Sequence, residues 1–181
     1  MRTTLSVLGS LLAMSMIQGC GSSAATPNDG GGSSACAITL TGGVTSVHGC
    51  AVTFAYDGTV PATDFSLSTT DVDSATEPNL YASIQTSGSP LPGTFTETDG
   101  RVLQGLLAVS ADDTTDAWSA DSATANTAVT GTFSLMITDL GSATPVGGSS
   151  FYTKTHGTLD ALLIPVTVGQ TTAAITAHAQ F

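Results

Sequence analysis

The sequence has very few positive charges. It contains three lysine and arginine residues against 14 aspartates and glutamates, and charged residues make up only 9% of the chain. Beyond residue 19 the only basic side chains are those of Arg101 and Lys154, which leaves a formal balance of −12. A surface of this sign repels phosphate backbones and anionic lipid headgroups. We therefore expect no nucleic-acid partner.

Long apolar runs are also scarce. The one clear run, residues 5–17, is shorter than the ~20 residues that a spanning helix needs. No other stretch reaches 18 apolar residues, so we expect no spanning helix in the rest of the chain. Two catalytic signatures are missing as well, the Gly-x-Ser-x-Gly elbow and the His-Glu-x-x-His metal helix.

The first 20 residues have the features of an export signal. Arg2 supplies a positive start, residues 5–17 an apolar segment, and Gly19 a small residue at the cleavage point. Cys20 follows directly, and the four residues that end there resemble the lipobox of bacterial lipoproteins, with Gln18 where a small residue is more usual. The resemblance implies that Cys20 becomes the first residue of the exported protein. It would then carry palmitate-type acyl chains that fasten the protein to a membrane.

Three segments follow from this reading. Residues 1–19 are the expected signal peptide, and residues 20–35 are the lipidated cysteine with a flexible Gly/Ser-rich tether. Residues 36–181 form the expected folded domain. With this organisation the chain resembles the short lipoproteins of myxobacteria and their relatives, and that resemblance implies no reaction. No aspartate stands beside the lipobox cysteine, which by the same resemblance indicates the outer membrane or cell surface.

Assigning Cys20 to lipid leaves two cysteines, Cys36 and Cys50, in an oxidising compartment. We expect a disulfide between them, which closes a loop of about 15 residues and stabilises the fold by about 3 kcal/mol. A hairpin with a three-residue loop at residues 42–44 places Cys36 opposite Cys50, whereas a two-residue turn misses this register by one. The disulfide thus also predicts the turn.

The rest of the domain alternates apolar and polar residues with a period of two. Apolar positions of this kind lie within residues 50–56, 65–67, 80–84, 129–137, 159–163 and 173–181. Residues 102–109 are more continuously apolar and predict a strand that is covered on both sides. Short strands separated by Gly, Pro and Asp predict a single all-β domain, an antiparallel β-sandwich of jelly-roll or immunoglobulin-like type. No segment predicts a helix.

Candidate catalytic residues are few. His178 falls on the polar side of its strand and is expected at the surface, while His48 lies within the disulfide hairpin. His156 and Asp160 are four residues apart on one strand, about 13 Å, too far for a base and its orienting carboxylate. Trp118, the only tryptophan, is expected to pack in the core rather than to stack on a sugar. We therefore expect no catalytic activity.

Two acidic clusters in predicted loops are the candidate metal ligands. The first contains Asp71, Asp73 and Glu77, and the second contains Asp112, Asp113 and Asp116. Closely spaced carboxylates on loops suit calcium, which takes six to eight oxygen ligands. Neither cluster has the EF-hand spacing, so solvated loops that carry no metal are the simpler interpretation.

Three hypotheses for the function follow. The leading one is a lipid-anchored envelope or cell-surface module that binds a protein or glycan partner and uses no cofactor. A calcium-dependent carbohydrate-binding module is the second. The third is a hydrolase whose site is assembled from residues distant in the sequence, with His48 or His156 as its base.

Overall fold

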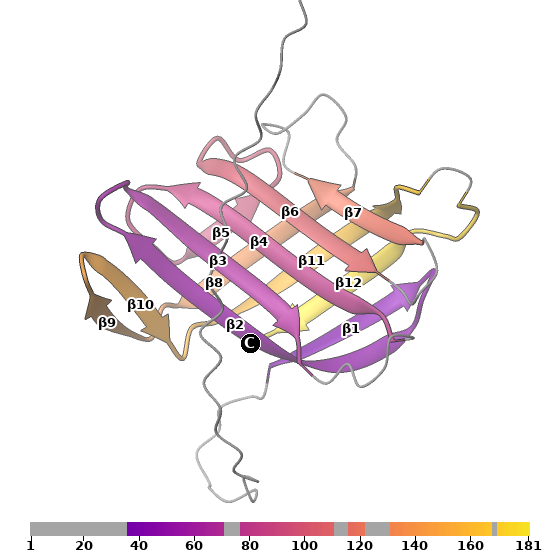
Figure 1. Cartoon of the computed structure of the whole chain (residues 1–181), viewed down its shortest axis with the longest axis horizontal. Helices are drawn as coiled ribbons and strands as arrows, with labels where there is room; N and C mark the ends of the chain where they lie inside the picture. The colour runs from indigo at the N-terminus through magenta and orange to yellow at the C-terminus, as the bar shows by residue number, and fades with distance from the viewer. Residues whose placement is uncertain (1–35, 71–76, 111–115, 122–130, 168–169) are drawn as a thin grey trace, which may run out of the picture. The chain divides into compact units, whose positions relative to one another are not determined.

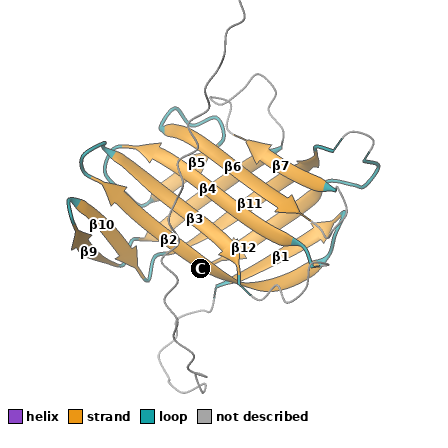
Figure 2. Ribbon diagram, in the orientation of Figure 1, coloured by secondary structure: helices purple, strands orange, loops and turns teal. Residues whose placement is uncertain are grey.

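The fold is built from β-strands in a computed structural model that describes residues 36–70, 77–110, 116–121, 131–167 and 170–181. The strands are β1 (Ala37–Gly42), β2 (Ser46–Asp57), β3 (Ala62–Thr69), β4 (Asn79–Ser87), β5 (Gly93–Thr96), β6 (Val102–Ser110), β7 (Ala117–Asp121), β8 (Thr132–Asp139), β9 (Ser142–Val146), β10 (Ser149–Thr153), β11 (His156–Pro165) and β12 (Ile175–Gln180). All their pairings are antiparallel, and the described part contains no helix (Figure 2), so the all-β prediction is confirmed. The expected signal peptide, Cys20 and the tether lie outside the described residues.

Eight strands close into a barrel, so the predicted sandwich is wrong in its architecture. Their order is β1-β12-β11-β7-β6-β4-β3-β2, and β1 pairs with β2 to complete the ring. Apart from β5 and β8–β10, which lie outside the ring, neighbours in the barrel follow one another along the chain. This up-and-down order is neither jelly-roll nor immunoglobulin-like.

The closure depends on two long strands that each pair with both halves of the structure. In β2, residues 46–49 pair with β1, and residues 54–57 pair with β10 on that same edge. In β11, residues 156–162 pair with β8, and Ile164 and Pro165 then pair with β7. We call the half with β1, β12, β11, β8 and β5 sheet A, and the half with β9, β10, β2, β3, β4, β6 and β7 sheet B. Figure 1 shows sheet B in front of sheet A.

The interior of the barrel is filled by side chains. One buried cluster takes apolar residues from nearly every strand of the ring, including Ile38, Phe65, Leu107 and Leu163. Alternation predicted these inward positions correctly in β3, β4, β11 and β12. The interior of an eight-stranded barrel is just wide enough for its own side chains or for one small ligand, and in this protein the buried cluster occupies it. The outer surfaces of the two sheets are therefore the places to look for function.

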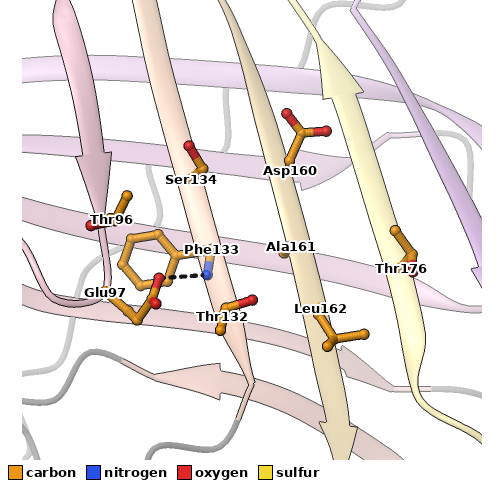
Figure 3. A pocket seen from close by; sticks show the side chains of 9 residues that line it. All are labelled: Thr96, Glu97, Thr132, Phe133, Ser134, Asp160, Ala161, Leu162 and Thr176. Atoms are coloured by element: carbon orange, nitrogen blue, oxygen red, sulfur yellow. Dashed lines mark hydrogen bonds between the residues drawn. The ribbon is translucent and has the colours of Figure 1, made fainter.

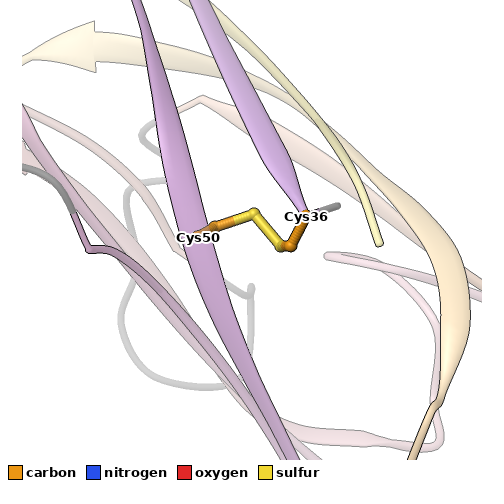
Figure 4. The surroundings of a disulfide bond; sticks show 2 residues. All are labelled: Cys36 and Cys50. Carbon is orange, nitrogen blue, oxygen red and sulfur yellow. A yellow bond between two sulfur atoms is a disulfide. The ribbon is translucent and has the colours of Figure 1, made fainter. Parts of the chain in front are cut away.

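The disulfide hairpin has the predicted register. Ile38 lies opposite His48 and Leu40 opposite Ser46, which places Cys36 opposite Cys50 across a three-residue loop. The two cysteines are bonded, with their Cα atoms 5.0 Å apart (Figure 4). Gly42 begins the loop with a φ of +104°, a conformation that L-residues rarely adopt. Both the disulfide and the turn predictions are confirmed.

Strand β6 differs from its prediction. Residues 102–109 were expected to be covered on both sides, but the strand alternates buried Val102, Leu107 and Val109 with exposed Leu103 and Leu106. A continuous apolar run gives no period, so it cannot show that one face of the strand lacks a covering layer. The uncovered face of β6 belongs to the outside of sheet B.

Trp118 closes one end of the barrel. Its side chain is buried, as the sequence predicted, and its indole Nε1 donates a hydrogen bond to the carbonyl oxygen of Ala173 at 2.9 Å. The same ring lies beside Gly43 in the hairpin loop. A large apolar body with one satisfied donor suits this position between three chain segments.

Candidate functional site

The two acidic clusters lie mostly outside the described residues. Asp71, Asp73, Asp112 and Asp113 are not described, while Glu77 and Asp116 stand just before β4 and β7. Within the described ranges, no group of three or more His, Cys, Asp or Glu side chains is placed to hold a metal ion. The calcium prediction therefore stays untested.

The described residues that flank these clusters lie together. Asn79, at the start of β4, is the partner of Ser110, at the end of β6. The hydroxyl of Thr69 donates to Asn79 Oδ1 at 2.6 Å, which ties the end of β3 to the start of β4. The segments 71–76 and 111–115 thus connect to the barrel through neighbouring strands at one end.

The three histidines lie in different places. His48 is buried on the inner side of β2, and His156 is half-buried at the start of β11. His178 lies on the outer face of β12, as predicted, and its Nδ1 is 2.6 Å from Asp160 Oδ1 on β11. Sequence spacing missed this Asp160–His178 pair because the β11–β12 register creates it. Both side chains of the pair are about half exposed on an open sheet. Active sites that exclude water from the reaction are, by contrast, enclosed.

The outside of sheet B carries a nearly uncharged surface, which we call the Tyr81 face. It consists of the outward side chains of β2, β3, β4 and β6, namely Ala51, Thr53, Ser66, Ser68, Tyr81, Ser83, Leu106 and Ala108. Two of them project from small neighbours, because Tyr81 is 47% and Leu106 is 38% exposed. Carboxylates border the face at Asp64, which accepts from Gln85 Nε2 at 2.8 Å, and at Asp121, opposite Leu106.

The hairpin of β9 and β10 continues this surface beyond β2. Phe151 lies opposite Ala55, and both Phe151 and Val146 are exposed. All five residues of β9 are exposed, and among the described strands it pairs only with β10, so it forms a free edge of sheet B. The hairpin is attached through Tyr152, which packs edge-on against Phe54 with ring centroids 5.7 Å apart. These two strands could not be predicted from the sequence, since neither alternates cleanly between apolar and polar residues.

The outside of sheet A carries an open groove of about 470 Å³, which we call the Leu162 groove (Figure 3). Its lining comes from β5, β8, β11 and β12 and the residue after β5, namely Thr96, Glu97, Thr132, Phe133, Ser134, Asp160, Ala161, Leu162 and Thr176. Glu97 Oε2 accepts a hydrogen bond from the backbone N–H of Phe133 at 3.0 Å. Leu162 is 42% exposed, so the groove presents an apolar side chain between its polar ones.

The free edge of sheet A is covered by Arg101. Its Nη2 donates to the carbonyl oxygen of Thr94 on β5 at 2.9 Å, and its guanidinium carbon lies 4.6 Å from the centre of the Phe95 ring. Asp99 accepts from the Arg101 side chain and backbone, and these bonds hold the pKa of Asp99 below its usual value. A similar bond from Thr59 lowers the pKa of Asp57.

No helix among the described residues is long and apolar enough to cross a membrane. Comparisons of the chain with protein-family models, with curated proteins and with solved structures found no match.

Proposed function

We propose that this protein is a lipid-anchored module of the bacterial envelope that binds a partner protein through the Tyr81 face and has no catalytic activity. The observation that carries the proposal is the exposure of Tyr81 and Leu106 on a sheet face with almost no charge. Burying such side chains against a partner releases about 25 cal/mol per Å² of apolar surface. Small neighbours such as Ser83 and Ala108 let a partner's surface approach the sheet closely.

A protein partner fits this face better than a glycan. Glycan binding by stacking needs several aromatic rings side by side, whereas Tyr81 is the one aromatic residue of the Tyr81 face and the exposed Phe151 lies three strands away on β10. Tyrosine is, however, enriched in the buried centres of protein interfaces and among the residues that dominate their binding energy. The interior of the barrel is occupied by its own core, so binding is assigned to the outer surface.

The proposed anchor is Cys20, and the proposed location is the outer membrane or cell surface. The lipobox-like run supports both, and several acyl chains together hold a protein on a bilayer almost permanently. Intact mass spectrometry of the native protein tests the anchor, since it should show acyl mass on a chain that begins at Cys20. A Cys20→Ser variant should leave the membrane fraction. If it stays wholly with the membranes, the anchor is assigned wrongly.

Site-specific crosslinking tests the Tyr81 face in the full chain. A photo-crosslinking residue at Tyr81 or Leu106 should give a discrete crosslinked band in intact cells. The same residue at Leu91, which is 62% exposed in the β4–β5 connection, is the matched control. The proposal fails if Leu91 gives the same bands as Tyr81. It also fails if the products at Tyr81 are glycan conjugates.

A calcium-dependent carbohydrate-binding module is the second candidate. The pairing of Asn79 with Ser110 favours it, because both acidic segments connect to the barrel at these neighbouring positions. A ligand that binds only the folded state raises its melting temperature by mass action. Millimolar calcium should therefore raise Tm, and an Asp112→Asn/Asp113→Asn variant should lose the rise. An unchanged Tm of the parent protein removes this candidate.

A further inference from the structure

The Leu162 groove is a second surface, separate from the Tyr81 face, with its own chemistry. Adjacent strands bring its residues together in two rows on the outside of sheet A. In one row Thr96, Ser134 and Asp160 are successive partners, and in the next Thr132, Leu162 and Thr176 are. Leu162 therefore stands beside Asp160 on the same side of β11.

Two carboxylates border the groove from opposite sides. Glu97 is held by the backbone N–H of Phe133, and Asp160 is held by His178. In each case the hydrogen bond uses one carboxylate oxygen. A carboxylate has about four lone-pair positions, so both groups keep capacity to accept further bonds from a ligand. Figure 3 shows Glu97 beside β8, Asp160 on β11, and Leu162 on the side of β11 that faces β12.

The described part of the protein has few positively charged side chains available to pair with the carboxylates of Glu97 and Asp160. Arg101 already binds Asp99 and the Thr94 carbonyl. Lys154 precedes β11, six residues before Asp160, which is about 20 Å along an extended chain. His178 adds positive charge only when it is protonated. The groove therefore combines an exposed leucine with negative charge that has little basic counterpart, and charge complementarity favours a cationic ligand.

The distance across the groove sets the spacing of that ligand's charges. The Glu97 carboxylate lies against β8, because its Oε2 is 3.0 Å from the Phe133 nitrogen, and Asp160 lies on the neighbouring strand β11, so the two carboxylates are at least one strand spacing of ~4.8 Å apart. An extended peptide advances about 3.3 Å per residue, so residues two apart, whose side chains point to the same side, are about 7 Å apart. Lysine and arginine stems are also apolar and pack well on leucine.

We propose that the Leu162 groove binds an extended basic segment of a partner protein, with two lysine or arginine side chains on Glu97 and Asp160. The aliphatic stems of these side chains lie on Leu162. This site is separate from the Tyr81 face. It gives the partner-binding module of the proposed function a second contact, made with a basic segment. Because the two surfaces lie on different sheets, each can be inactivated alone.

Fluorescence anisotropy with the full lipid-anchored chain in nonionic micelles tests the proposal. The probe is a labelled peptide of alternating threonine and lysine, and the neutral comparison replaces lysine with glutamine. The lysine peptide should bind and should weaken as salt rises. Glu97→Gln and Asp160→Asn should each raise Kd about three- to tenfold, as expected for one lost charge contact. Glutamine keeps an oxygen for the Phe133 N–H, so the fold is preserved.

Asp64→Asn is the matched control, because it removes the same charge from sheet B. It should change Kd less than twofold, whereas Leu162→Ser should weaken binding without changing charge. The proposal is overturned if Asp64→Asn weakens binding as much as Asp160→Asn, since the interaction then reflects overall charge. It is also overturned if the lysine peptide does not bind, or if the glutamine peptide or a neutral oligosaccharide binds equally well.

Discussion

At the residue scale, Gly131 is the position where β11 changes partner from β8 to β7. Its φ is +80°, and a Cβ added there would lie 2.2 Å from the carbonyl oxygen of Leu162 and 2.8 Å from that of Ser119. Both contacts are with backbone, which cannot move without shifting two strands. The glycine is therefore required for conformation and for space.

We predict that Gly131→Ala destabilises the fold by at least about 3 kcal/mol, from backbone strain and displaced strands together. Gly88→Ala is the control, because Gly88 has a similar φ of +86° with nothing within 4 Å of an added Cβ. Gly88→Ala should lower the free energy of unfolding by only the ~1–2 kcal/mol that a left-handed backbone conformation costs an L-residue. Denaturant unfolding measures both, and equal losses would contradict the crowding at Gly131.

Asp99 gives a second residue-scale prediction. Side-chain and backbone hydrogen bonds from Arg101 lower its pKa in the folded state. A lowered pKa stabilises the fold above the unfolded value of 3.8, and this contribution is lost as the pH falls through the folded value. In Arg101→Gln the pKa of Asp99 should rise toward 3.8, and carboxyl NMR titration measures it. The pKa of Asp57, which Thr59 lowers, should not change.

At the element scale, the sequence predicted most of the inward faces. Period-two alternation places a residue on one of two faces, and burial of Phe65, Ile84, Leu159 and Ile175 confirms those placements. It failed where a strand is uniformly apolar, as in β6, or exposed on both faces, as in β9. In both cases the missing information is what covers the strand, and that is set by strands distant in sequence.

The free edge of β9 is protected by Pro145. Val146 and Ser149 flank the two-residue turn of Gly147 and Gly148, and flanking residues of this kind exchange both backbone hydrogen bonds. The nitrogen of Pro145 therefore points away from β10, where an ordinary residue would offer an N–H to another strand. Proline at this position weakens edge-to-edge pairing between molecules.

We predict that Pro145→Val increases self-association, because it restores a donor on an exposed edge. Sedimentation velocity in a Cys20→Ser background measures this without the proposed anchor. Pro145→Lys restores the same donor but adds charge, and it should stay closer to the parent protein. If the valine and lysine variants associate equally, the free edge of β9 is not the contact.

At the scale of the whole molecule, the sequence could not distinguish a barrel from a sandwich. Both have the same alternation, and the difference lies in whether long strands continue from one sheet into the other. In β2 the first four residues pair with β1 and the last four with β10, a change of partner that leaves no trace in the alternation. The two surfaces that we propose for binding also depend on the pairing of distant strands. Glu97, Asp160 and Thr176 meet only through strand register.

Closure of the ring brings the first and last strands of the domain together, since Ala37 on β1 is the partner of Gln180 on β12. A circular permutant that joins residues 181 and 36 by a short linker and opens between Leu91 and Pro92 should therefore fold, because that connection is exposed. Residues 1–35 are kept at its new N-terminus. The permutant should unfold cooperatively, and its free energy of unfolding should lie within about 2 kcal/mol of that of the parent protein, because the new linker costs only loop-closure entropy. Opening instead inside β2, between Ala51 and Val52, divides the strand that both sheets share. That permutant should lose the β-sheet circular dichroism signal, and equal stability of the two would show that the shared strand does not hold the barrel closed.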